Sequence, residues 1–135
     1  MDFYFDENFS HAMASAMNEL EKVGREHRVF HTNSDPDIGE GMKDEILIPI
    51  IGKKHGILMT KNKKQATKRA QRELLQLHGV SAFFFGTPSV DHWEQMRLIM
   101  LWWQRIIRAA KDKQAHKQPR YFIVLSRGGT KPWED

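Results

Sequence analysis

The sequence predicts an α/β fold in three layers, with helices on both faces of a mostly parallel central sheet. Short apolar segments typical of strands alternate with amphipathic segments typical of helices over the first hundred residues. Residues 80–85 are almost all apolar, as in a strand that is buried on both faces. A helix between successive strands permits parallel pairing through right-handed crossovers.

The individual elements follow from the apolar spacing and from the residues that start and stop each segment. Strands are expected at 2–6, 27–32, 57–60, 80–85 and 121–126, and helices at 10–23, 46–51, 65–78 and 90–115. Ser10 is a typical cap for the first helix, and Gly79 suits a left-handed residue that ends the third.

Two segments are less regular. Residues 46–51 fit a helix or a strand by periodicity alone, and Pro49 disrupts the interior of either. We predict a short helix that carries Pro49 in or near its first turns. Residues 33–41 are rich in glycine and acids and predict an exposed loop, and Gly128-Gly129 begins a short polar tail.

Composition sets the broad class of protein. The 135 residues fit one domain, 1–135, because two independent domains would each be too small. The absence of cysteine excludes disulfides, thiolate metal sites and cysteine nucleophiles. No secretory leader precedes Asp2, and the longest apolar run, 98–103, is far short of the ~20 residues that span a bilayer. We expect a soluble, cytoplasmic protein, and its net charge of +4 mildly favours a polyanionic partner.

Three oxygen-bearing side chains are candidates for a metal site. Asp6 follows the first strand, Asn62 follows the strand 57–60, and Asp44 begins the helix between them. Side chains after neighbouring parallel strands gather at one edge of a sheet. Mg²⁺ and Mn²⁺ take such ligands together with waters and substrate phosphate, and they promote phosphodiester hydrolysis. On spacing alone, a turn role for Asp6 and a helix-start role for Asp44 are the more common explanation.

A basic stretch begins at the same turn. Six cations lie within residues 61–72: Lys61, Lys63, Lys64, Lys68, Arg69 and Arg72. If Ala66, Ala70, Leu74 and Leu77 face inward, Lys68 and Arg72 lie on a solvent-facing stripe. Such a stripe contacts a phosphate backbone through salt-dependent charge interactions, although a solvated helix face is the ordinary alternative. No aromatic residue interleaves with these cations, so base stacking is not expected from this stretch.

The predicted helix 90–115 is apolar around much of its girth. One stripe contains Trp93, Met96, Met100, Trp103 and Ile107, and another contains Ile99, Trp102, Ile106 and Ala109. A helix of this kind is buried or covers a partner. We expect the first stripe to pack in the core. The second is either core or a surface for a second copy or another protein.

Several segments resemble the PIN-like nucleases, and within them the VapC-type toxin branch. They are Phe5-Asp6-Glu7-Asn8, Asp44-Glu45-Ile46, Ile57-Leu58-Met59-Thr60-Lys61-Asn62, residues 79–85, the Trp-rich helix and residues 119–124, in that order along nearly the whole chain. The resemblance implies a single three-layer α/β/α PIN-like domain. It also implies an endoribonuclease that depends on Mg²⁺ or Mn²⁺ and is the toxin of a type II toxin–antitoxin pair.

The resemblance assigns the metal and catalytic roles to Asp6, Asp44 and position 62. Here the chain departs from the family pattern, since Asn62 replaces an acid and removes one negative charge. The attraction between unit charges near a surface is roughly 4 kcal/mol at ~4 Å, so we expect lower metal affinity. Glu7, Glu45 and Thr60 are candidate supports, and the loop acids Asp35 and Asp37 could compensate if the loop folds inward.

The resemblance also implies three partners: RNA, an antitoxin protein, and a second copy that binds through the helix 90–115. Loss of the acid at position 62 leaves an alternative, a catalytically weakened or inactive PIN-like module that binds RNA or a protein.

Overall fold

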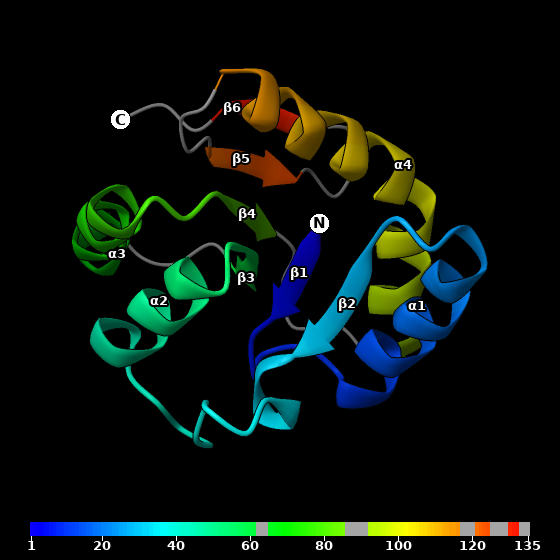
Figure 1. The fold of residues 1–135 in the computed structure, drawn as a ribbon, viewed down its shortest axis with the longest axis horizontal. Coiled ribbons are helices and arrows are strands. Elements are labelled where there is room, and N and C mark those ends of the chain that lie inside the picture. The colour runs from blue at the N-terminus through cyan, green and yellow to red at the C-terminus, as the bar shows by residue number, and fades with distance from the viewer. Residues whose placement is uncertain (62–64, 86–91, 117–120, 125–129, 133–135) are drawn as a thin grey trace.

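The computed structural model describes residues 1–61, 65–85, 92–116, 121–124 and 130–132. Strands and helices alternate along the chain (Figure 1). The elements are β1 (Asp2–Phe5), α1 (His11–Gly24), β2 (Arg28–His31), the 3-10 helix η1 (Thr32–Ser34), α2 (Asp44–Lys53), β3 (Gly56–Lys61), α3 (Gln65–His78), β4 (Ala82–Phe85), α4 (His92–His116), β5 (Tyr121–Val124) and β6 (Thr130–Pro132).

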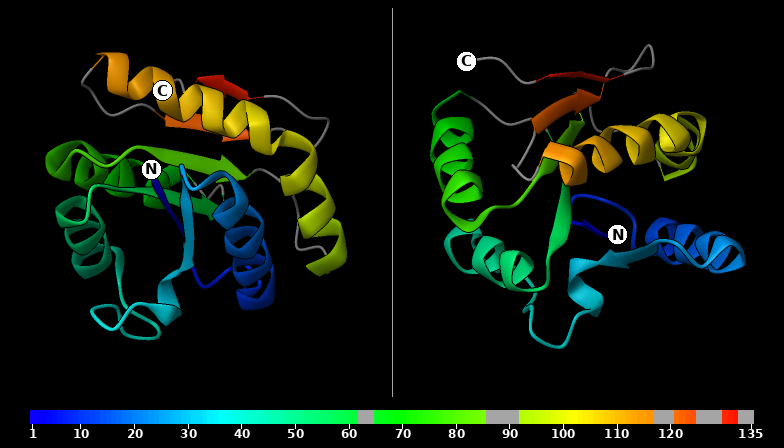
Figure 2. Two further views of the ribbon diagram at one scale, coloured as in Figure 1. Left: turned by 45° about the vertical axis from the view of Figure 1, so that its right-hand side comes forward. Right: turned by 45° about the horizontal axis from the view of Figure 1, so that its top comes forward.

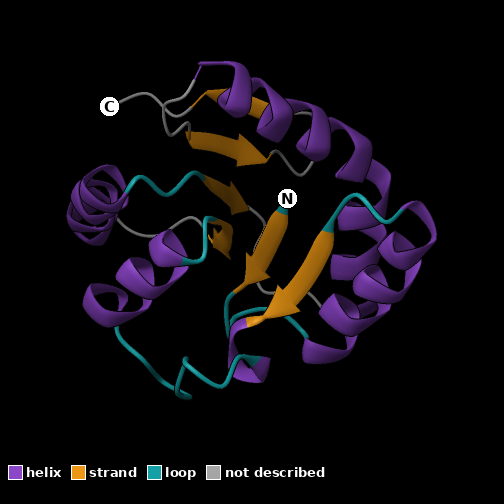
Figure 3. Ribbon diagram, viewed as in Figure 1, coloured by secondary structure: helices purple, strands orange, loops and turns teal. Residues whose placement is uncertain are grey.

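These strands form one sheet in the order β2-β1-β3-β4-β5-β6 (Figure 3). The strands β1 to β5 pair in parallel, which confirms the predicted sheet, and β6 is antiparallel to β5. The prediction of a polar tail missed β6. This strand is only three residues long and contains Pro132, which is tolerated at the edge of a sheet but gives no strand signal in the sequence.

Helices cover both faces of the sheet, as the three-layer prediction requires (Figure 2). Alternate strand residues point to opposite faces. On one face, Phe3 and Phe5 pack with α1 and α4, and on the other face Tyr4 packs with α2 and α3. Each face therefore has its own apolar core. No helix in the described ranges is long and apolar enough to cross a bilayer.

Local signals set several helix ends. The Ser10 side chain accepts a hydrogen bond from the Met13 N–H and caps α1, as predicted. Gly79 is left-handed (φ +67°) after α3, also as predicted. At the end of α1 the left-handed residue is Arg25, whose N–H bonds to the Glu21 carbonyl, and Gly24 remains inside the helix. Pro49 lies inside α2, where it removes one intrahelical hydrogen bond.

The predicted inward face of α3 is wrong at Ala70 and Leu77, which are exposed, and right at Leu74, which packs against the core. Gln71 and Leu75 are also buried, and the side chain of Ala66 lies outside the described residues. Leu75 joins the apolar core formed with α2, and Gln71 has a polar partner there, described below. A buried residue that is polar but hydrogen-bonded is invisible to a search for apolar periodicity.

Burial of the two apolar stripes on α4 also differs from the prediction. Ile99 and Ile106 of the second stripe are buried, so that stripe packs in the core. In the first stripe, Trp103 is buried against Phe3, but Trp93 and Met100 are exposed. The reason is geometric: the middle of α4 crosses the sheet, while its first turns lie beside α1 (Figure 2).

Candidate active site

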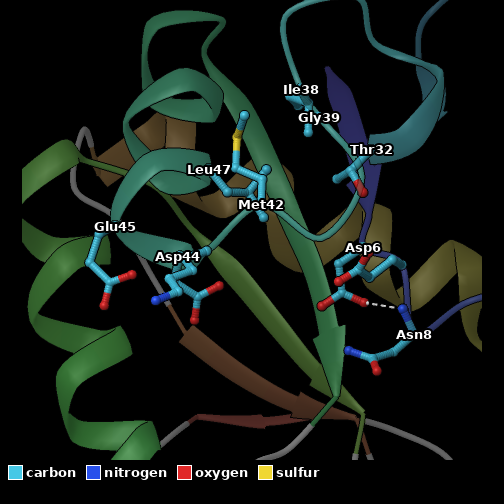
Figure 4. A pocket seen from close by; sticks show the side chains of 11 residues that line it. Asp6, Asn8, Thr32, Ile38, Gly39, Met42, Asp44, Glu45 and Leu47 are labelled. Atoms are coloured by element: carbon cyan, nitrogen blue, oxygen red, sulfur yellow. Dashed lines mark hydrogen bonds between the residues drawn. The ribbon is translucent and has the colours of Figure 1, made fainter.

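A cavity of about 310 Å³ opens at the carboxyl end of β1 (Figure 4). Three segments line it: the β1–α1 connection, the loop before α2, and the first turn of α2. The lining residues are 6–8, 38–39 and 42–45, with Thr32 and Leu47. Ligand sites in open parallel sheets lie at this edge. Asp6 and Asp44 therefore reach one cavity, although they are far apart in the sequence.

Asp6 is held at the end of β1 by its neighbour β3. The two strands are in register with Phe5 opposite Met59, and the Asp6 N–H continues the ladder to the Met59 carbonyl (3.1 Å). The side chain of Asp6 is 7% exposed. Its Oδ2 accepts a bond from the Thr60 hydroxyl (2.5 Å), and its Oδ1 accepts one from the Asn8 N–H (3.0 Å). These donors fix the direction of the carboxylate.

Asp44 is the first residue of α2, and its position follows from two features. Negative side chains are favoured at a helix N-terminus. In addition, Asp44 Oδ2 accepts a bond of 3.2 Å from Nε2 of Gln71 on α3. Gln71 is 2% exposed, and its Oε1 is buried without a hydrogen-bond partner. Apolar periodicity does not predict that Gln71 is buried. The one indication in the sequence is that Gln71 lies four residues before the apolar Leu75, and so on the same face of the helix.

The supporting acids have different surroundings. Glu7 lines the cavity, and its Oε2 accepts a bond from the Gly41 N–H (3.0 Å), which ties the loop to the β1–α1 connection. Glu45 also lines the cavity but lies farther from Asp6 than Asp44 does (Figure 4). The loop acids Asp35 and Asp37 are not among the residues that line the cavity. Their carboxylates lie 3.5 and 2.7 Å from Nζ of Lys54.

The donor set suits a cation that keeps part of its own hydration. Figure 4 shows Asp6 and Asp44 on opposite sides of the β3 ribbon. Within the described ranges, no three acidic or histidine side chains converge closely enough to enclose a metal ion. Asn62 lies outside those ranges. Mg²⁺ is commonly bound by one or two carboxylates with waters and substrate phosphates, and Asp6 and Asp44 can supply that number.

The predicted basic stripe is only partly described. Lys61 is partly buried at the end of β3, and Arg69 is exposed on α3. Arg72 does not lie on a solvent-facing stripe: it is partly buried, and its guanidinium lies 5.9 Å from the centre of the Tyr121 ring. Burial raises the pKa of Tyr121 to about 12, against the opposing effect of the Arg72 charge. Lys63 and Lys64, and the side chain of Lys68, lie outside the described part of the chain.

Comparisons with known proteins give one match. Residues 1–87 match the profile of the family described as PIN like domain. No curated protein and no solved structure matches the chain. The matched residues run from β1 through β4 and include Asp6, Asp44 and Thr60, and the observed three-layer α/β/α fold agrees with such a domain. The chain therefore belongs to the PIN-like domain family, whose fold is of the nuclease type.

Proposed function

We propose that the protein is an endoribonuclease that depends on a divalent metal and acts at the cavity between β1 and α2. One observation carries the proposal. Asp6 and Asp44 line the same cavity at the carboxyl edge of the sheet, and each accepts a hydrogen bond from a buried side chain of another element, Thr60 or Gln71. Two oriented carboxylates at the ligand edge of a nuclease-type fold support hydrolysis of phosphodiesters.

In this proposal Asp6 and Asp44 hold Mg²⁺ or Mn²⁺, with Asn62 as a neutral third ligand. When bound, such an ion lowers the pKa of a water molecule and polarises a phosphoryl oxygen. The protein's own groups do the positioning. Thr60 and the Asn8 N–H hold the Asp6 carboxylate, Gln71 holds that of Asp44, and Glu7 keeps the loop before α2 at the rim of the cavity.

RNA is the proposed substrate because the chain is basic, with a net charge of +4, and resembles ribonuclease toxins around Asp6, Asp44 and Asn62. The exposed Arg69 and the partly buried Lys61 are candidates for contacts with the phosphate backbone, together with Lys63, Lys64 and Lys68. We further propose that the protein is the toxin of a type II pair, acts in the cytoplasm and is neutralised by an antitoxin protein. A homodimer through α4 would use the exposed Met100 and Leu101.

The test is Mn²⁺ binding by isothermal titration calorimetry, together with cleavage of single-stranded RNA. We expect the wild-type protein to bind Mn²⁺ and to cleave RNA, and Asp6→Asn to lose both properties. Asp37→Asn is the matched control, since this exposed acid is bound to Lys54 and does not line the cavity. Retention of Mn²⁺ binding and cleavage by Asp6→Asn would refute the proposed site.

A second candidate is a non-catalytic PIN-like module that binds RNA or a protein. Its support is the limited donor set: no three acidic or histidine side chains converge within the described ranges, and the residue at position 62 is neutral. This module would bind RNA equally well with and without Mn²⁺ and would cleave none. The same experiments therefore separate the two candidates.

A further inference from the structure

A second hollow lies close to the acidic cavity and has the opposite chemistry. It has a volume of about 300 Å³ and is lined by Ser10, Ala12, Met13 and Ala16 of the α1 region and by Trp93 and Met96 of α4. The first turns of α4 lie beside α1 in both views of Figure 2. Trp93 is 75% exposed, whereas tryptophan is highly buried on average. An aromatic side chain thus borders an apolar hollow that is open to solvent.

The apolar hollow and the acidic cavity are lined by the same short connection. Asn8 lines the acidic cavity and Ser10 lines the apolar hollow, and the Cα atoms of such a pair are at most about 7 Å apart. The Ser10 N–H donates to Oε1 of Gln95 (3.0 Å), and Gln95 is 8% exposed. This partly buried hydrogen bond joins the start of α4, two residues after Trp93, to the segment that carries Asp6.

The net charge of α4 is positive, which favours a polyanion. From His92 to His116 the helix has five cationic residues and two acids, Glu94 and Asp112. Arg97, one residue after Met96, is exposed and forms an ion pair with Glu94. Farther along, the guanidinium of Arg105 lies 4.7 Å from the centre of the Trp102 ring. Proteins that bind single-stranded nucleic acid combine a positively charged surface with aromatic side chains on which bases stack.

We propose that the apolar hollow holds an unpaired nucleobase of the RNA strand whose phosphodiester lies in the acidic cavity, with the base stacked on Trp93. The proposal rests on the proposed ribonuclease function and identifies its substrate as single-stranded RNA. It also supplies the aromatic contact that the basic stretch 61–72 lacks. Stacking on a tryptophan is tolerant of sequence, so this contact selects for an unpaired base more than for a particular base.

The experiment measures binding of short RNA to the full chain in EDTA, so that no metal-dependent cleavage interferes. The probes are a single-stranded oligonucleotide and a set of copies that each lack one base. We expect Trp93→Leu to weaken binding of the intact oligonucleotide about 10-fold. For one of the abasic copies, the wild type should bind as weakly as Trp93→Leu does, because the two changes remove the same contact.

Two further variants control for folding and surface chemistry. Trp93→Phe keeps an aromatic face and should restore most of the affinity. Val23→Ala alters an exposed apolar residue of α1 that does not line the hollow, and it should leave binding unchanged. Circular dichroism verifies that each variant is folded.

Equal RNA affinity of Trp93→Leu and wild type would overturn the proposal. The same holds if Trp93→Leu loses self-association but still binds RNA, because the hollow would then be an interface between protein copies. If Trp93 contributes to RNA binding but the wild type cleaves no RNA with Mn²⁺, the base site stands and the nuclease proposal fails. If cleavage depends on Asp6 but neither binding nor cleavage depends on Trp93, the nuclease proposal stands and the base site fails.

Discussion

Acidic side chains at the amino and carboxyl ends of the parallel strands, the amino and carboxyl edges of the sheet, have different hydrogen-bond partners. At the amino edge, Asp2 is bound by the guanidinium of Arg28 through bonds of 2.9 and 2.7 Å. At the carboxyl edge, neutral groups donate hydrogen bonds to both acids: a threonine hydroxyl and a backbone N–H to Asp6, and a glutamine amide to Asp44. A neutral donor fixes a carboxylate without adding a positive charge next to it. The comparison indicates that Asp2 has a structural role, whereas the hydrogen bonds to Asp6 and Asp44 orient two acids that line a cavity.

The two cavity acids also differ from each other. Asp6 is buried and belongs to the end of a strand, so the sheet itself sets its position. Asp44 is partly exposed and accepts a hydrogen bond from Gln71 of α3, a separate helix. The direction of the Asp44 carboxylate therefore depends on the packing of α2 against α3. Substitution of the donors Thr60 and Gln71 should show how much each acid depends on its hydrogen bond.

The largest effect is expected from Thr60→Val. This change keeps the side-chain volume but removes the hydroxyl that donates to Asp6 in a buried site. We expect Mn²⁺ affinity to fall about 10- to 100-fold. The free energy of unfolding should also fall by about 1–3 kcal/mol, because a buried acceptor loses its partner. Calorimetry and urea denaturation measure the two effects. Thr60→Ser keeps the hydroxyl and should retain Mn²⁺ binding; if it behaves as valine does, packing and not the hydrogen bond is responsible.

A smaller effect is expected from Gln71→Met, which keeps the chain length but removes the donor to Asp44. We expect Mn²⁺ affinity to fall about 10-fold, as for other groups that orient a metal ligand. Stability should change little, because methionine also removes the buried Oε1 that has no partner. Gln76→Met, at an exposed position of the same helix, is the control. Equal Mn²⁺ affinity of Gln71→Met and wild type would show that Asp44 needs no support from α3.

The amino edge should contribute nothing to metal binding. Asp2→Asn removes the ion pair between Asp2 and Arg28. Both residues lie at the first positions of β1 and β2, at the opposite end of these strands from the cavity. We expect unchanged Mn²⁺ affinity and only a slight loss of stability, since exposed ion pairs contribute little. A fall in Mn²⁺ affinity comparable to that of Thr60→Val would contradict the contrast between the edges.

The smallest effect is a dependence of stability on pH at the amino edge. Burial, and next the charge of the N-terminus, lower the pKa of His27 below its usual 6.5. The unfolded chain therefore binds a proton more readily than the folded chain. Stability is complete above pH 6.5 and declines as the pH falls through the lower, folded-state value. Chemical denaturation between pH 7.5 and 5 should show this loss, and His27→Gln should reduce it. An unchanged pH profile in His27→Gln would assign the loss to other groups.

Much of the fold could be predicted because local chemistry decides it. Alternating strand and helix patterns predicted the parallel pairing of the strands, and Ser10 and Gly79 marked helix ends through their own bonding and backbone preference. The convergence of Asp6 and Asp44 on one cavity followed from the rule that parallel strands present their carboxyl ends together.

The errors concern side chains whose partners are distant in the sequence. Gln71 is buried because it meets Asp44 on another helix, and apolar periodicity cannot show such a pair. The loop acids Asp35 and Asp37 pair with Lys54, which follows the last residue of α2, and they do not line the cavity. Trp93 is exposed because of where α4 crosses the sheet, and no local sequence pattern predicts that crossing point.

The most direct test is to measure Mn²⁺ binding by calorimetry in the wild type, Asp6→Asn, Asp44→Asn and the double variant. If the two carboxylates hold one ion, each single change should abolish the same site, and the double change should cost little more. Binding that survives either single change unaltered, or losses that simply add, would contradict a shared metal ion between β1 and α2.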